Sequence, residues 1–493
     1  MKPRALAVVL AVLVLMFAAA CGASNSSGER ATNTEPRNGT DQAAPSTARE
    51  HDTGVTERQD TTVDQISTFA LDVDTASYGY AKQVLKEGRL PERDRVRPEE
   101  FVNSFRQDYR EPEGDGFSVQ MDGARMPGNG TALLRVGLRT RAAQAQARRP
   151  ANLTFVVDVS GSMGEPGRLD LVRDALHELI GQLGSGDQIS IVAFSDQAEV
   201  VLSMTPATEK DELNAAVERL AVQASTNLEA GLTSGYAEAA KAFRPVATNR
   251  VILLSDGLAN NGDTSWQGIL ERVEENAGKQ ITLLCVGVGR DYGDQLMEQL
   301  ADNGDGAAVY VSSVDEARKV FVEQLATTLD LRARDAKAQV VFNPSTVESY
   351  HLIGYENRRI AAEDFRDDSK DGGEVGPGHS VTALYEVRLR DGASGQLATT
   401  TVRWQDPDTR DPGEVTRSLE SADLAASPWR EPSPRFQVDV AAASFAEYLR
   451  TGETLAGTGV GELAEHAAWL AASTEDPAVT ELADLITRAL SLR

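Results

Sequence analysis

Three short polar side chains stand together in the middle of the chain. Asp158, Ser160 and Ser162 occur as Asp-Val-Ser-Gly-Ser directly after the apolar run Leu153–Val157. A carboxylate and two hydroxyls are oxygen ligands of the kind that hard divalent cations such as Mg²⁺ prefer. Two further oxygen donors follow along the chain, Thr226 and the Asp256 of Ser-Asp-Gly. These residue types predict a metal site, provided that the fold brings them together.

These oxygen donors lie at or near the ends of predicted strands. Between residues 151 and 329, apolar runs alternate with amphipathic stretches of helical spacing, which predicts an α/β fold with a doubly wound, mainly parallel sheet. Such sheets bind ligands in the crevice at the carboxyl ends of their strands. Val200–Met204 follows its neighbour so closely that we expect an antiparallel edge strand. The other predicted strands are Leu153–Val157, Ile189–Phe194, Val251–Leu254, Ile281–Val288 and Ala307–Val311.

Taken in order, the three motifs resemble the metal-ion-dependent adhesion site of von Willebrand factor type A (VWA) domains, over roughly residues 151–329. The resemblance implies a VWA (Rossmann-like) sheet that binds Mg²⁺ or Mn²⁺. It also implies that some ligands act through water and that an Asp or Glu of a protein partner completes the coordination. Family members often have Gly before the Thr, whereas Ala224 and Ser225 stand there in this chain. The implied metal ligands are Asp158, Ser160, Ser162, Thr226 and Asp256.

A second interpretation of the same residues needs no metal. Short polar side chains commonly accept hydrogen bonds from the backbone at helix N-termini. The Asp and Ser cluster could therefore be a set of helix caps, and the first motif by itself does not separate the two interpretations.

The N-terminal segment differs in composition from the rest. Lys2 and Arg4 precede the apolar run Ala5–Ala20, which is typical of a secretory signal peptide and short for a membrane-spanning helix. Ala-Ala-Ala-Cys-Gly at its end resembles a lipobox, which implies cleavage before Cys21 and lipid attachment there. We therefore expect an extracytoplasmic protein that is anchored to the cell membrane at Cys21.

Charge and cysteine content exclude several classes of protein. The net charge of −26 argues against nucleic-acid binding, which requires clustered Lys and Arg. With Cys21 lipidated, Cys285 has no partner, which excludes a disulfide framework, and its apolar surroundings predict a buried core residue. From Gly22 to Gln65 there is no Phe, Tyr, Trp, Leu or Met, so this stretch is expected to be a disordered tether.

The predicted α/β region is flanked by the segments Thr68–Tyr78, Glu87–Pro91, Glu100–Asn103, Leu352–Arg358 and Gly378–Val387. These segments resemble YfbK-like bacterial lipoproteins. We expect strands both before Ala151 and after Arg332, with the possibility that they form one β module into which the α/β domain is inserted. The predicted parts are 1–20 signal peptide; 21–65 lipidated Cys and tether; 66–150 N-terminal β-containing domain; 151–329 VWA domain; and 330–493 β-rich, then helical, domain.

Function is expected to be non-enzymatic: binding of a protein partner through the metal, in adhesion or envelope complex assembly, with no small-molecule substrate. The alternative is a chelatase-like or stress-related assembly factor that works with an ATPase. Asp72-Val-Asp74 faintly resembles the paired aspartates of haloacid-dehalogenase phosphatases, but Ala76 replaces the expected Thr. The sequence has no Walker A loop and no Gly-x-Ser-x-Gly motif.

Overall fold

A computed structural model describes residues 65–492 apart from gaps at 72–74, 128–129, 143–148, 257–265, 290–293, 305, 312–316, 319, 322–331, 368–371, 408 and 456–457. The predicted signal peptide, the Cys21 anchor, the tether and Asp72–Asp74 lie outside the described residues. Within the described part of the chain, no helix combines the length and the apolar character needed to cross a bilayer.

The central region is an α/β domain, as the alternating pattern predicts. Its sheet has six strands in the order β6-β5-β4-β7-β8-β9, parallel except for the edge strand β6, which pairs with β5 in the antiparallel sense as expected. The strands are β4 (Ala151–Asp158), β5 (Gln188–Phe194), β6 (Ala198–Pro206), β7 (Thr248–Ser255), β8 (Ile281–Val288) and β9 (Ala307–Val311).

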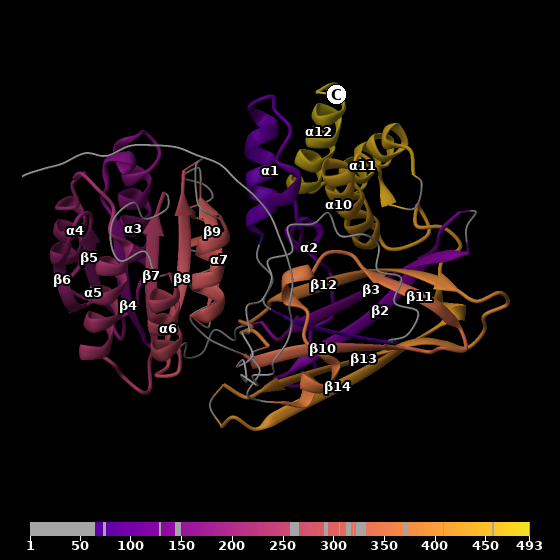
Figure 1. Cartoon of the computed structure of the whole chain (residues 1–493), viewed down its shortest axis with the longest axis horizontal. Helices are drawn as coiled ribbons and strands as arrows, with labels where there is room; N and C mark the ends of the chain where they lie inside the picture. The colour runs from indigo at the N-terminus through magenta and orange to yellow at the C-terminus, as the bar shows by residue number, and fades with distance from the viewer. Residues whose placement is uncertain are drawn as a thin grey trace, which may run out of the picture. The chain divides into compact units, whose positions relative to one another are not determined.

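Helices cover both faces of this sheet (Figure 1). Apolar residues of α3 and α4 pack on one face together with Phe155 and Val157, whereas α5, α6 and α7 pack on the other face with Val156. Successive side chains of a strand point to opposite faces, and because both faces are covered, β4 is buried along its whole length. The helices are α3 (Leu169–Gln182), α4 (Lys210–Glu218), α5 (Leu228–Lys241), α6 (Trp266–Ala277) and α7 (Asp294–Asn303).

Strand order places a ligand crevice between β4 and β7. The chain runs from β4 to β5 and β6 on one side, then crosses to β7, β8 and β9 on the other side of β4. The helix that follows β4 and the helix that follows β7 therefore lie on opposite faces. An open doubly wound sheet binds ligands at this reversal point.

The rest of the described chain contains two antiparallel sheets, with strand orders β1-β10-β13-β14 and β11-β12-β3-β2. β3 precedes the α/β domain and β12 follows it, yet the two pair along their length from Arg139↔Ser380 to Thr131↔Arg388. The expected insertion of the α/β domain into one β module is thereby confirmed. The strands are β1 (Ile66–Ala70), β2 (Phe117–Arg125), β3 (Thr131–Thr140), β10 (Arg334–Phe342), β11 (Val347–Leu352), β12 (Ser380–Leu389), β13 (Gln396–Gln405) and β14 (Pro412–Glu420).

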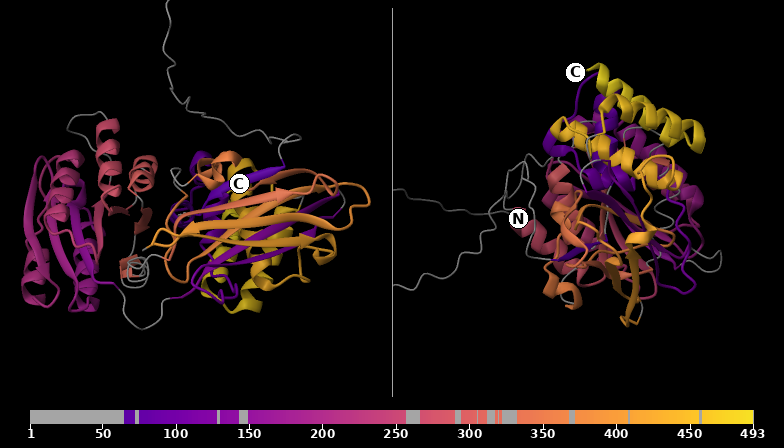
Figure 2. Two further views of the ribbon diagram at one scale, coloured as in Figure 1. Left: turned by 90° about the horizontal axis from the view of Figure 1, so that it is seen from below. Right: turned by 90° about the vertical axis from the view of Figure 1, so that its right-hand side faces the viewer.

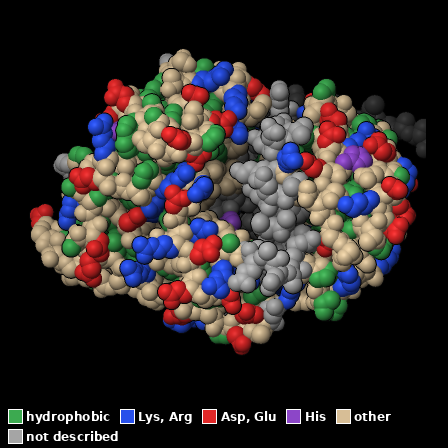
Figure 3. Space-filling view, turned by 180° about the vertical axis from the view of Figure 1, so that it is seen from behind, with side chains coloured by type: hydrophobic (Ala, Val, Ile, Leu, Met, Phe, Trp, Pro, Cys, Tyr) green, Lys and Arg blue, Asp and Glu red, His purple; other side chains and the backbone are tan. Residues whose placement is uncertain are grey.

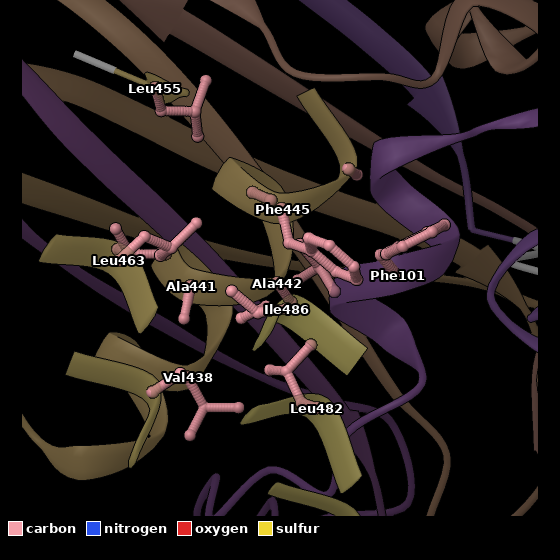
Figure 4. Close-up of a cluster of buried hydrophobic side chains, with 14 of the residues drawn as sticks. Phe101, Val438, Ala441, Ala442, Phe445, Leu455, Leu463, Leu482 and Ile486 are labelled. Atoms are coloured by element: carbon pink, nitrogen blue, oxygen red, sulfur yellow. The ribbon is translucent and has the colours of Figure 1, made fainter. Parts of the chain in front are cut away.

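The helices that pack on these sheets in the described part of the chain lie on one side of them (Figure 2). On β3, Leu134 and Val136 point into the core between the sheets, while Leu133 points toward the helices. Figure 4 shows the helical core, where Phe101 packs near Phe445. The helices are α1 (Ala76–Lys86), α2 (Pro98–Asn103), α10 (Pro434–Thr451), α11 (Val460–Thr474) and α12 (Pro477–Ser491).

Charged side chains lie on the surface of the protein (Figure 3), and the cysteine of the α/β domain lies in its core. Acidic and basic side chains are interspersed over the face that Figure 3 shows. Cys285 on β8 is fully buried, which confirms the expected core position.

Candidate metal centre

Asp158 and Asp256 come from neighbouring strands at the crevice. β4 ends at Asp158, and Asp256 directly follows the last residue of β7. The two strands pair in parallel, with Val157 opposite Leu254, so both carboxylates emerge at the same edge of the sheet. Asp158 is fully buried and Asp256 is 3% exposed. Two acidic groups without water around them require hydrogen bonds or a cation.

A chain of hydrogen bonds joins the predicted donors. Asp158 Oδ1 accepts from the Ser160 backbone N–H at 2.8 Å, and Asp158 Oδ2 accepts from Ser255 Oγ at 2.6 Å. Ser160 Oγ and Ser162 Oγ lie 3.1 Å apart, and Ser162 Oγ donates to Asp256 Oδ1 at 2.8 Å. Four of the five predicted ligands are therefore linked through hydrogen-bonded neighbours, although Asp158 and Asp256 stand 98 residues apart in the sequence.

The environment of Asp158 disfavours its negative charge. Burial raises the pKa of this carboxyl, and nearby Asp256 acts in the same direction. Hydrogen bonds from Ser255 and Ser160 lower the pKa but do not cancel the effect of burial. A cation at this position would offset that cost by favouring the charged carboxylate.

Thr226, the fifth predicted ligand, lies in a loop that is tied to the crevice. The Gln223 N–H donates to Val159 O at 2.6 Å, and the Asn227 N–H donates to Ser195 O at 2.6 Å. Asn227 also caps α5, because its side chain accepts from the Ala230 N–H at 3.0 Å. Thr226 itself is 6% exposed. The loop is therefore held beside the residues that follow β4.

Ser225 adopts the left-handed backbone conformation, with φ of +69°. Non-glycine residues rarely adopt this region, which glycine enters without a steric cost. The sequence pattern in which Gly often precedes the Thr thus has a physical counterpart here. Hydrogen bonds on both sides hold Ser225 in a conformation that suits Gly.

Arg168 contacts the centre from the start of α3. Its Nη1 donates to Asp256 Oδ2 and, at 3.2 Å, to Ser162 O. Its Nη2 lies 2.8 Å from a carboxylate oxygen of Glu165. Gly289, at φ of +93°, leaves room for this side chain, since a Cβ there would lie 3.0 Å from Arg168 Nε.

Chemically, the donor set fits a hard divalent cation. Mg²⁺ and Mn²⁺ favour oxygen ligands from carboxylates and hydroxyls with water completing the shell. Among the described residues, no three His, Cys, Asp or Glu side chains are grouped to hold a metal, so a softer site rich in nitrogen or sulfur is not offered there. Two carboxylates with three hydroxyls suit a cation that keeps open positions.

Sequence reasoning did not assign roles to Ser255, Arg168 or Gln223. Ser255 was within reach of the sequence, because it belongs to the Ser-Asp-Gly motif and precedes a predicted ligand. Arg168 and Gln223 carry no local signal, since their partners Asp256 and Val159 lie 88 and 64 residues away.

Comparison with known proteins identifies the α/β domain and the family of the chain. Residues 152–324 match the family "von Willebrand factor type A domain", residues 327–395 match "Uncharacterized protein YfbK, C-terminal", and residues 46–135 match "von Willebrand factor". The "Uncharacterized protein YfbK" of Escherichia coli (strain K12) is 31% identical over 459 residues, which cover 86% of this chain and 78% of that protein. The chain belongs to the YfbK family.

Membership confirms the expected YfbK-like chain with a VWA domain, which indicates a role in protein interaction or adhesion. Other relatives match less of the chain. "Uncharacterized protein sll0103" of Synechocystis is 30% identical over 38% of this chain and 44% of its own length. "Inter-alpha-trypsin inhibitor heavy chain H4" of Sus scrofa is 28% identical over 45% of this chain and 25% of its own length. The solved structure "von Willebrand factor type A from Catenulispora acidiphila" matches with a TM-score of 0.46 at 18% sequence identity. The match covers 75% of this chain and 89% of that one.

Proposed function

We propose that this YfbK-family chain binds a protein partner through a divalent cation, Mg²⁺ or Mn²⁺, held by Asp158, Ser160, Ser162, Thr226 and Asp256. An Asp or Glu of the partner would complete the coordination of the cation. The centre carries no chemical step of its own in this proposal. The role is adhesion or the assembly of an envelope complex.

The observation that carries the proposal is the hydrogen-bonded path from Asp158 through Ser160 and Ser162 to Asp256. It brings oxygen donors from the ends of β4 and β7 together at the reversal point of the sheet, where Asp158, Ser160 and Asp256 are buried. Helix capping alone does not account for this path, because Asp158 ends β4, Asp256 follows β7, and Ser160 and Ser162 connect them. When bound, the cation would supply the positive charge that attracts a carboxylate to an otherwise acidic protein.

Calorimetric titration of Mn²⁺ and Mg²⁺ into the purified full chain tests the metal site. We expect saturable binding that Asp158→Asn and Asp256→Asn each weaken at least about tenfold, equivalent to about 1.4 kcal/mol. The matched control is Asp211→Asn, which changes an exposed aspartate in the first turn of α4. Binding that is unchanged in both site variants would refute the assignment.

A partner test follows from the same variants. The chain is immobilised and exposed to envelope extracts in Mg²⁺, in chelator, and as Asp158→Asn. A partner that binds only in Mg²⁺ and only to the unaltered site supports the proposal, whereas retention in chelator contradicts it. Recovery of an ATPase as that partner would favour the assembly-factor alternative over adhesion.

Localisation is part of the proposal and rests on sequence alone. Lys2, Arg4, the apolar run and Cys21 together support export and lipid attachment. Metabolic labelling with a radioactive fatty acid should mark the protein in its native host, and Cys21→Ser should abolish the label. A Cys21→Ser protein that is labelled and membrane-bound as before would contradict the anchor.

A further inference from the structure

Arg168 is a positive charge built into the candidate centre. It is 7% exposed and bonds the Oδ2 of Asp256, while Ser162 Oγ bonds the Oδ1 of the same carboxylate. Both carboxylate oxygens of Asp256 therefore accept hydrogen bonds from residues that directly precede α3 or lie a few residues before it. The carboxylate of Glu165, which also contacts Arg168, belongs to a side chain that is 66% exposed, so water screens its charge more strongly than that of Asp256.

The contact between Arg168 and Asp256 changes the net charge that surrounds a bound cation. Asp158, Asp256 and Arg168 together carry one net negative charge, and a bound divalent cation would turn it into one net positive charge. Without the guanidinium, the two carboxylates would neutralise the cation completely. A neutral centre holds the cation more tightly but attracts an anionic ligand less, because the cation's charge decides the local field.

We propose that Arg168 is a positioning residue that keeps the bound cation electrophilic, weakening metal affinity in exchange for affinity toward a partner's carboxylate. This inference rests on the proposed metal-dependent function. The guanidinium holds Asp256 through Oδ2 and withdraws part of its charge from the cation. Gly289 provides the space in which the guanidinium stem lies.

The experiment separates the two affinities in the full chain. Mn²⁺ affinity is measured by calorimetry in acetate-free buffer. Acetate is then titrated into the Mn²⁺-loaded protein, and displacement of metal-bound water is followed by water-proton relaxation. For Arg168→Gln we expect about tenfold tighter Mn²⁺ binding and about tenfold weaker acetate binding, each factor equivalent to about 1.4 kcal/mol.

Two further variants serve as controls. Arg168→Lys keeps the positive charge beside Asp256, and if this charge sets the field at the cation, both affinities should stay within about threefold of the original. Arg318→Gln removes an exposed arginine that pairs with Glu178 at 3.0 Å in the same domain, which changes the net charge equally. Both its affinities should be unchanged. Thermal unfolding monitored by circular dichroism verifies that each variant is folded.

Outcomes distinguish this inference from the proposed function. If the unaltered chain binds Mn²⁺ and Asp158→Asn abolishes it, but Arg168→Gln leaves both affinities unchanged or weakens both, the role of Arg168 is refuted and the metal site stands. If Arg168→Gln fails to fold, unchanged affinities in Arg168→Lys together with opposite shifts in Arg168→Met support the inference. Absence of Mn²⁺ binding in the unaltered chain refutes the metal site and this inference together.

Discussion

Arg135 on β3 and Asp439 on α10 form a buried ion pair, with Arg135 Nη1 2.8 Å from Asp439 Oδ2. The pair joins a strand that precedes the α/β domain to a helix that follows it. Gln107 donates to the other oxygen of Asp439 at 2.6 Å, and the guanidinium lies over the rings of Tyr109 and Phe436. The surrounding bonds satisfy the polar atoms that burial removes from water.

We expect Asp439→Asn to lower the free energy of unfolding by about 3 kcal/mol. The substitution removes the buried carboxylate beside the Arg135 guanidinium and leaves Asp122, whose side chain is partly exposed, as its acidic partner. Urea unfolding followed by fluorescence measures the loss. Arg106→Gln is the control, since Arg106 and Asp108 form an exposed pair whose loss should cost less than about 0.5 kcal/mol. Equal losses in the two variants would contradict a structural role for the buried pair.

Glu99 on α2 is a buried acid in acidic surroundings. Burial, with Glu356 and Glu100 nearby, raises its pKa from the ordinary 4.5 to about 8. Among the described residues its Oε2 has no hydrogen-bond partner, and a Cβ on Gly354 would lie 2.1 Å from this oxygen. The raised pKa means that the folded protein favours the protonated acid, whose contribution to stability is full below about pH 4.5 and is lost as the pH rises through about 8.

Glu99→Gln, which is neutral at every pH, should therefore be more stable than the original chain by about 1–3 kcal/mol at pH 9. Near pH 4.5 the two should be equally stable to within about 1 kcal/mol, because both side chains are then neutral. Urea midpoints across this pH range give the difference. The exposed Glu113→Gln serves as the control. Parallel stability curves for Glu99→Gln and the original chain would show that Glu99 is ionised when folded.

The sequence predicted the α/β fold because the inner strands of its sheet are buried on both faces. Such strands appear as uninterrupted apolar runs, and Ile281–Val288 and Ala307–Val311 were found with the bounds of β8 and β9. The ligand motifs were found because each directly follows a strand or precedes a helix. The local sequence pattern is sufficient to predict a residue's position wherever a single helix or strand determines that position.

Contacts between distant segments could not be predicted in the same way. Arg135 looks like a polar residue of an alternating strand, and nothing near it in the sequence indicates Asp439, which lies 304 residues later. Arg168 likewise looks like a surface residue at the start of a helix. The left-handed conformation of Ser225 depends on bonds from Gln223 and Asn227 to separate strand ends. These features arise from tertiary structure that overrides local preference.

Ser225 gives a prediction for the Thr226 loop. Ser225→Gly should raise the free energy of unfolding by up to about 1 kcal/mol, because glycine adopts a positive φ without steric cost. Ser225→Val should lower it by about 1–2 kcal/mol and weaken Mn²⁺ binding, since a β-branched residue resists this conformation and would displace Thr226. Urea unfolding and calorimetry measure the two effects. If valine is tolerated like glycine, the left-handed conformation is not required for the loop.

Gly235 determines how closely α5 approaches the sheet. A Cβ on Gly235 would lie 2.2 Å from Val156 Cγ2 on β4, while one on Gly231 would lie 2.7 Å from the Phe194 ring. Gly235→Ala should therefore lower the free energy of unfolding by about 1–3 kcal/mol, although alanine favours helices. Gly181 in α3 has no atom within 4 Å of its Cβ position, so Gly181→Ala should instead stabilise by about 0.5–1 kcal/mol. Opposite signs in urea unfolding would show that close packing of α5 outweighs helix propensity, and a stabilised Gly235→Ala would show that it does not.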